Sequence, residues 1–342
     1  MPSPAPRSRV PWHALLIGVL TAGFLWWFFH NLNFGEVWRS IEGANLKLIA
    51  MAVGVTLVTY VLRAFRWQAL LRPIGHATFR NAFRTTVIGF TASFLLPGRL
   101  GDVLRPYLLA RAEGFKTAST LATVLIERVM DLASVLLLFG WLLLTADMEV
   151  GREVKIAGAA SSIAAIVAIG VLLASAGHPE RLGRWAGRLV GVLPARAREA
   201  VTRFVHTFTE GLAVMRRPAP LIIAFVLSVL VWLSIGLGIW LTSQAFNLTF
   251  SFVGSFLVIM FLVVGVAVPT PGGVGAFHKM YQFAVTTFFG AAADAAAACA
   301  IVLHAVSFVP VSLMGLFFMA QDGLTFRGLR TMKSTAEAQS DT

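Results

Sequence analysis

Long apolar runs separated by short polar segments dominate the chain from Trp12 to Ala320. Such runs predict membrane-crossing helices, because a helix needs roughly 20 apolar residues to cross the hydrocarbon core. The pattern predicts six full crossings and two broken hairpins, which a hydropathy count could score as eight segments. The expected crossings are Trp12–His30, Leu48–Leu71, Thr117–Thr145, Ile156–Ala176, Leu221–Ala245 and Ala293–Ala320. We therefore expect an all-α, polytopic membrane helix bundle.

Two further apolar runs, Thr86–Leu96 and Phe250–Val268, end in proline and glycine rather than in a polar loop. Proline lacks an amide hydrogen and glycine accepts unusual backbone angles, so helices break at these residues. A break at membrane depth is tolerated where it is buried in protein or lines a wet cavity. The residues predicted to make these structural breaks are Pro97, Gly98, Gly101, Pro269 and Pro271.

The two breaks occupy similar places in the two halves of the chain. Basic residues on both sides of the first break indicate a re-entrant hairpin that opens to the cytoplasm. The second segment, Phe250–Phe289, either enters and leaves on the outer side or makes two short crossings. Paired interruptions of this kind indicate a transporter binding site and a possible inverted repeat. The alternative is two unrelated kinks that ease packing.

The remaining segments divide into tails and loops around one membrane domain. We expect a cytoplasmic N-terminal tail at 1–13, a single membrane domain at 14–320 and a cytoplasmic polar tail at 321–342. Within the domain, 177–220 is predicted to be a basic amphipathic loop. It could lie on the cytoplasmic leaflet or bind a soluble envelope-biosynthesis partner. Phe34–Lys47 is a short amphipathic connection on the outer side.

Composition supports the membrane interpretation. The chain has 342 residues, of which 57% are hydrophobic and only 13% are charged. The formal net charge of +12 resides mainly in loops, which is typical of positive-inside charge against anionic lipid rather than of nucleic-acid binding. We therefore expect an inner-membrane protein with both termini in the cytoplasm. A single cysteine and seven scattered histidines give no metal-binding spacing, and we expect no cofactor.

Charged residues inside the third predicted crossing are the strongest candidates for a functional site. Glu127, Arg128 and Asp131 lie within one helical turn of one another, and Arg128 and Asp131 can pair. Charges in the bilayer are costly, so these side chains should face the protein interior. One arginine against two carboxylates leaves the cluster short of positive charge, which Arg99 or Arg105 could supply. The cluster could hold a lipid phosphate, or it could pin the first hairpin.

Two other groups of residues have open interpretations. Arg63, Arg66 and Arg72 lie near the end of the second predicted crossing and could be interfacial anchors or phosphate ligands. The glycine-rich turn could offer amide hydrogens to a phosphate at a helix start, or it could only allow close packing. The glycines concerned are Gly272, Gly273 and Gly275.

Four segments together resemble a known family. They are LRAFRWQALL, FLLPGRLGDVLRP, ATVLIERVMDL and VPTPGGVGAFHKMY, and the likeness spans about 14–320. This combination resembles the membrane domain of lysylphosphatidylglycerol synthases, a flippase-type domain. In bifunctional members the domain precedes a soluble aminoacyl-transferase. Stand-alone members, which this chain resembles in length, are linked to envelope-lipid, hopanoid or polyprenol-linked transport.

The chain departs from the family pattern at two positions. Asp102 stands where the family usually has glutamate, which keeps the charge on a shorter side chain. His278 stands where glutamate commonly follows the second glycine-rich turn, and histidine can titrate near neutral pH. The sequence shows no soluble transferase domain, so we expect no enzymatic activity from this chain alone.

These observations predict a protein that moves a phosphate-bearing lipid between leaflets. The expected substrate is an anionic phospholipid, a hopanoid-type lipid or a polyprenyl-linked lipid. An integral-membrane transferase and a scaffold for envelope-biosynthesis enzymes are the alternatives. The candidate substrate-binding residues are Arg99, Asp102, Arg105, Glu127, Arg128, Asp131, Gly272, Gly273, Gly275 and His278. Asp102, Glu127 or His278 could carry protons.

Overall fold

A computed structural model describes residues 12–96, 101–145, 156, 159–160, 162–163 and 218–324 of the chain. Within these ranges every regular element is helical, which confirms the predicted helical membrane bundle. The α-helices are α1 (Trp12–Phe29), α2 (Phe34–Glu42), α3 (Leu46–Leu71), α4 (Phe79–Leu95), α5 (Gly101–Glu113), α6 (Thr117–Thr145), α10 (Pro218–Ala245), α11 (Ser255–Ala267), α12 (Ala276–Phe289) and α13 (Ala293–Gln321). Two short 3₁₀ turns, η2 (Phe252–Gly254) and η3 (Pro271–Gly273), flank α11.

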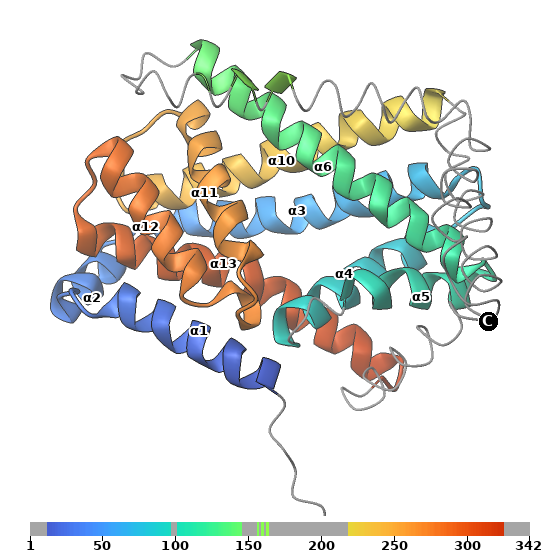
Figure 1. Cartoon of the computed structure of the whole chain (residues 1–342), viewed down its shortest axis with the longest axis horizontal. Coiled ribbons are helices and arrows are strands. Elements are labelled where there is room, and N and C mark those ends of the chain that lie inside the picture. The colour runs from blue at the N-terminus through green and yellow to red at the C-terminus, as the bar shows by residue number, and fades with distance from the viewer. Residues whose placement is uncertain are drawn as a thin grey trace, which may run out of the picture.

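Long helices form the body of the bundle. In Figure 1, α3, α6, α10 and α13 run between its left and right ends. Three of the described helices are apolar and long enough to cross a membrane, with candidate spans at Leu46–Leu71, Ala219–Ala245 and Ala293–Gln321. α6 has a suitable length of 29 residues but carries the three predicted interior charges. The count of six crossings stays a prediction, because most of Ile156–Ala176 lies outside the described residues.

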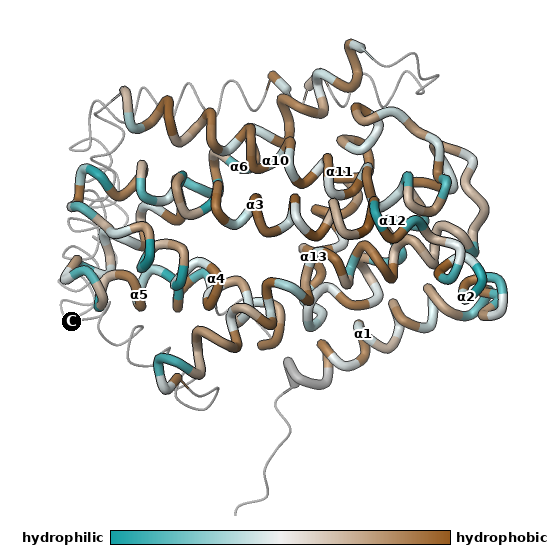
Figure 2. Tube along the Cα trace, turned by 180° about the vertical axis from the view of Figure 1, so that it is seen from behind, coloured by the Kyte–Doolittle hydropathy of each residue, from teal (hydrophilic) through white to brown (hydrophobic). Residues whose placement is uncertain are grey.

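Polar residues gather at the two ends of the bundle, on α2 at one end and on α4 and α5 at the other, while the long helices between them are hydrophobic (Figure 2). Local sequence explains where the first helices begin. Asn33 and Asn45 accept hydrogen bonds from the first free amides of α2 and α3, as N-cap residues commonly do. The backbone amide of Asn33 also donates to the Asp294 carboxylate at 3.0 Å, which joins α2 to the start of α13.

Two helical hairpins enter the bundle from opposite ends. In Figure 1, α4 and α5 come from the right end, whereas α11 and α12 come from the left end. The rings of Phe250 and Phe289 stack at 4.6 Å, so the second segment returns to where it began. Its helices have 13 and 14 residues, or about 20 Å at 1.5 Å per residue, against a hydrocarbon core of about 30 Å. The geometry therefore favours a re-entrant hairpin over two short crossings.

Several predicted boundaries need correction. α4 begins at Phe79, seven residues before the predicted apolar run Thr86–Leu96, so Arg80 and Arg84 belong to the helix. α12 begins at Ala276, directly after the glycine-rich turn. α1 begins at Trp12, as predicted, and α13 ends at Gln321, one residue beyond the predicted crossing. Most of the basic loop 177–220 lies outside the described residues.

Candidate functional site

The tips of the two hairpins meet inside the bundle. The carbonyl of Phe94, at the end of α4, lies so close to Gly272 of η3 that a Cβ there would be 3.4 Å from it. The phenyl rings of Phe94 and Phe308 are 4.4 Å apart, and α13 therefore packs against the same point. The end of α4, just before the first break, and the second break therefore meet in space.

Close approach explains the glycines of the second tip. Gly272 and Gly275 have positive φ angles of 59° and 84°, which residues with a side chain rarely adopt. A Cβ on Gly275 would lie 3.0 Å from the backbone nitrogen of Leu25 in α1. The Gly273 amide donates to the Thr270 carbonyl and the Gly275 amide to Nδ1 of His278. These two amides are used within the turn, so the structure favours close packing over phosphate binding there.

His278 lies in α12 and is buried against a second histidine. Its ring centroid is 4.7 Å from that of His304 on α13, and 5.2 Å from that of Phe28 on α1. Nε2 of His304 is 2.9 Å from the Gly272 carbonyl, so His304 joins α13 to the second tip. A lone histidine in an apolar helix gives no spacing signal, and sequence reasoning missed this contact.

Buried ion pairs join the first hairpin to α3 and α6. Glu127 is fully buried and receives two arginines: Nη1 of Arg105 donates to its Oε1 at 2.8 Å, and Nη2 of Arg66 lies 3.0 Å from the same oxygen. Arg66 also donates to Asp131 and to Ser228. The guanidinium of Arg105 stacks 3.8 Å above the ring of Trp67. These contacts confirm that interior charges face the protein and that Arg105 supplies positive charge.

The interpretation of the α3 arginines as interfacial anchors is wrong for two of the three. Arg66 is fully buried and Arg63 is 8% exposed, while Arg72 is exposed as an anchor would be. Arg66 faces inward because two carboxylates of α6, Glu127 and Asp131, lie opposite it. Those partners are about 65 positions away in the sequence, beyond the reach of any local spacing rule.

A second, half-exposed layer covers the buried pairs. Nη2 of Arg128 donates to Asp102 at 2.8 Å, and Nη1 lies 3.6 Å from Asp131. The Arg128 and Asp102 side chains are about 40% exposed, in contrast to Glu127 beneath them. Asp102, in the first turn of α5, thus pairs with an arginine of the cluster. Arg99, with Pro97 and Gly98, lies outside the described residues.

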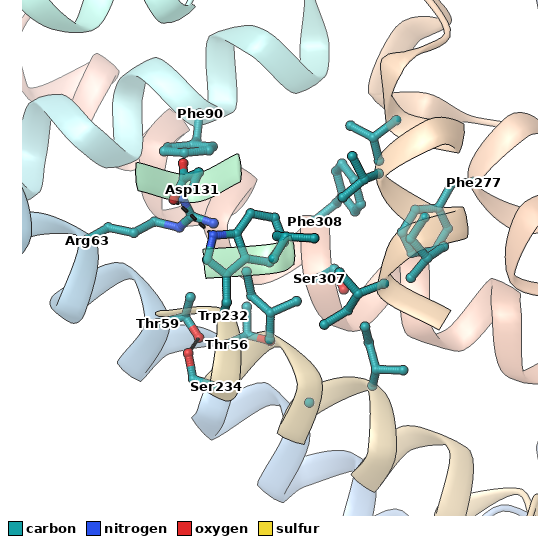
Figure 3. A pocket seen from close by; sticks show the side chains of 18 of the residues that line it. Thr56, Thr59, Arg63, Phe90, Asp131, Trp232, Ser234, Phe277, Ser307 and Phe308 are labelled. Carbon is teal, nitrogen blue, oxygen red and sulfur yellow. Dashed lines mark hydrogen bonds between the residues drawn. The ribbon is translucent and has the colours of Figure 1, made fainter. Parts of the chain in front are cut away.

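A cavity of about 400 Å³ runs from this cluster toward the junction of the hairpin tips. Figure 3 shows Arg63, Asp131 and Trp232 gathered on one side and Phe277 and Phe308 on the other. Trp232 donates from its indole nitrogen to Asp131 at 3.0 Å. The hydroxyls of Thr59 and Ser234, 2.8 Å apart, add polar groups to the wall. The cavity therefore has a charged end and a mainly apolar remainder.

Of the predicted site residues that the structure describes, two line this cavity, namely Arg128 and Asp131. Asp102, Arg105 and Glu127 belong to the ion-pair network behind its charged end. The three glycines and His278 lie at the second tip. Among the lining residues that sequence reasoning missed are Tyr60, Phe90, Trp232 and Ser234. They are uncharged and lie outside the motifs quoted above, so no sequence signal marked them.

The described part of the cluster has an excess of positive charge. It contains four guanidinium groups, from Arg63, Arg66, Arg105 and Arg128, and three carboxylates, from Asp102, Glu127 and Asp131. One positive charge therefore has no matching carboxylate within the described residues. A buried site of this kind attracts an anion.

Comparison with known proteins identifies membrane proteins that are similar to this chain. A protein called a UPF0104 membrane protein, from Methanothermobacter thermautotrophicus, is 23% identical over 299 residues, which cover 82% of this chain and 87% of that protein. A second UPF0104 membrane protein, from Methanocaldococcus jannaschii, is 23% identical over 105 residues, or 30% of this chain and 31% of its own.

Another relative matches over a shorter part. The glycosyltransferase AglD of Haloferax volcanii is 28% identical over 138 residues, which cover 40% of this chain and 21% of that protein. The family model of the lysylphosphatidylglycerol synthase TM region matches residues 12–315, which contain both hairpins, the charge cluster and the cavity. The chain therefore belongs to the lysylphosphatidylglycerol synthase TM region family, the family that its sequence motifs resemble.

Proposed function

We propose that this membrane protein moves a phosphate-bearing lipid between the leaflets of the cytoplasmic membrane. The observation that carries the proposal is the cavity that joins the meeting point of two opposed hairpins to a cluster with one excess positive charge. Discontinuous hydrophobic segments that meet near a polar site are typical of transporters. The headgroup would enter the cavity while the acyl chains stay in the bilayer.

The proposal assigns binding and no group transfer to this chain. Within the described cluster, Asp102, Glu127 and Asp131 each lie against at least one arginine. A carboxylate paired in this way is a weak general base. The match to part of a protein named as a glycosyltransferase supports a glycan-bearing lipid as one candidate substrate, beside phospholipids and hopanoid-type lipids.

A reconstituted leaflet-exchange assay tests the proposal. Fluorescent anionic and zwitterionic phospholipids and a polyprenyl phosphate would each be placed in one leaflet of vesicles containing the protein. We expect movement of at least one lipid class, with a slower rate in Arg128→Ala. Arg39→Ala is the matched control, because Arg39 forms an exposed pair with Glu36 on α2. No movement of any lipid by folded, correctly oriented wild type would refute the function.

A further inference from the structure

Arg63 differs from the other arginines of the cluster. Arg66, Arg105 and Arg128 each lie within 4.0 Å of a carboxylate oxygen, whereas no such partner of Arg63 is found in the described ranges. Its side chain is buried, and its Nε, like that of the other three arginines, has no hydrogen-bond partner there. A buried guanidinium without a partner is costly, so a ligand that supplied an acceptor would be bound favourably.

The surroundings of Arg63 hold it toward the cavity. Its guanidinium carbon lies 4.7 Å from the ring centre of Phe90 and 5.8 Å from that of Tyr60. Figure 3 shows it pointing to the region between Phe90 and Trp232. In the nearby carboxylate of Asp131, Oδ1 receives Arg66 and the indole of Trp232, and within the described residues no hydrogen bond joins Arg63 to Oδ1 or Oδ2. A molecule inside the cavity can therefore supply an acceptor to Arg63.

We propose that Arg63 binds the phosphate of a lipid that carries one negative charge, namely a phosphodiester lipid. This inference rests on the proposed function and names its substrate class. A phosphodiester carries a single charge, which matches the single excess positive charge of the described cluster. A phosphomonoester carries about −1.5 to −2 at neutral pH, so it would bring unpaired negative charge into the cavity.

The same cavity offers a route for the hydrocarbon chains. Leu132 on α6 and Val263 on α11 both line it, and they are 58% and 42% exposed. Such strongly exposed residues in a cavity wall indicate where the cavity opens. Leu132 follows Arg128 by one helical turn, so the opening lies next to the half-exposed charge layer. The chains of a lipid held at Arg63 extend past Leu132 and Val263 into the bilayer.

Substitution of Arg63 tests the headgroup contact. Purified wild type, Arg63→Lys, Arg63→Gln and the control Arg39→Gln would be compared for phosphatidylglycerol and phosphatidic acid by native mass spectrometry of bound lipid and by leaflet exchange. We expect wild type to prefer phosphatidylglycerol. Arg63→Gln should lose about tenfold in binding and rate, as expected for one charge-assisted hydrogen bond. Equal binding by Arg63→Gln and wild type, or a wild-type preference for phosphatidic acid, would overturn the proposal.

Cysteine labelling tests the opening. Cys299 is fully buried, so an introduced surface cysteine would react selectively with a bilayer-soluble maleimide. Labelled Leu132→Cys should bind and move phosphatidylglycerol at least several-fold more weakly than before labelling. Labelled Leu125→Cys is the control, because Leu125 is 52% exposed on the same helix but does not line the cavity. Equal effects of the two labels would refute the opening, and this arm remains informative if Arg63→Gln does not fold.

The two proposals fail in different ways. If wild type binds phosphatidylglycerol through Arg63 but moves no lipid, the transport function fails and the binding site stands. If wild type moves lipid and neither Arg63→Gln nor the Leu132 label changes the rate, transport stands and this binding site is refuted.

Discussion

The two hairpins reach the same junction but are held there by different contacts. The first is held by charge: Arg105 pairs with buried Glu127, and Asp102 pairs with Arg128. The second is held by close packing and neutral hydrogen bonds. Its Gly272 carbonyl lies beside His304, and the side-chain amide of Gln282 in α12 donates to the Ala293 carbonyl at 3.0 Å. Both hairpins also pack closely through glycine. The first should therefore lose most stability when a charged partner is removed, whereas the second should lose only the smaller energy of a neutral hydrogen bond.

Removal of the Glu127 charge should have the largest effect. Glu127→Gln leaves Arg66 and Arg105 buried with less compensation, and breaking a buried pair costs about 3–5 kcal/mol. Unfolding in detergent, by denaturant or heat, measures the loss. Glu36→Gln is the control, because its exposed pair with Arg39 contributes at most about 1 kcal/mol. Equal losses in the two variants would show that the first hairpin does not depend on buried charge.

A methyl group between α4 and α5 should have the next largest effect. A Cβ on Gly101 would overlap the Gly89 carbonyl, so Gly101→Ala should destabilise the protein by about 1–3 kcal/mol through overpacking. Gly54→Ala in α3 is the matched control, because it meets no heavy atom within 4 Å. We expect the control to be neutral or up to about 1 kcal/mol more stable. The same unfolding measurement would contradict the packing argument if Gly101→Ala were as stable as Gly54→Ala.

Loss of His304 should loosen the second tip and leave the first unchanged. His304→Leu removes the partner of the Gly272 carbonyl and should cost about 1 kcal/mol. Hydrogen–deuterium exchange should rise in 269–275 while α5 keeps its wild-type protection. A parallel increase in exchange in 269–275 and in α5 would mean that the two hairpins are stabilised as one unit. That result would contradict the view that different contacts hold them.

The smallest effect concerns Glu113 at the open end of the first hairpin. Burial alone would raise the pKa of Glu113, but hydrogen bonds from Thr78 and Asn81 lower it overall. Because the folded-state pKa is the lower one, the stabilisation is present above the ordinary glutamate value of about 4.3 and is lost as the pH falls through the folded value.

Glu113→Gln should therefore lower stability at neutral pH by less than about 1 kcal/mol, since the group is only partly buried. Unfolding measured at pH 7 and in acid checks this, and the difference between variant and wild type should shrink in acid. A difference that stays constant with pH would contradict the assignment to this carboxylate.

The sequence was sufficient for the elements and their pairing because these depend on local pattern. The run Thr117–Thr145 became α6 with the same bounds. Both breaks were visible as proline and glycine after apolar residues, and the geometry brings the end of α4, just before the first break, against the second. Hydropathy and backbone chemistry act over a few residues, so a single sequence contains them.

The site was less accessible because its contacts are long-range. The sequence showed that Glu127 and Asp131 needed cations, and one of them, Arg105, was identified. The other, Arg66, lies on α3, where its position near a helix end fits an interfacial anchor equally well. Helix packing determines which groups pair with a buried charge, and residue spacing in the sequence does not predict that packing. The role of Arg63 was also undetermined from the sequence, and its lack of a carboxylate partner is visible only in the structure.

The Arg66–Glu127 contact also constrains how the protein enters the membrane. α3 is synthesised before α6, so Arg66 reaches the bilayer about 60 residues before its carboxylate partner exists. A lone arginine at the bilayer centre costs about 2.5–3.5 kcal/mol on insertion scales. Arg66 is only five residues from the end of α3, within reach of the headgroups. We expect α3 to insert first with Arg66 directed toward that surface, and to turn it inward when α6 arrives.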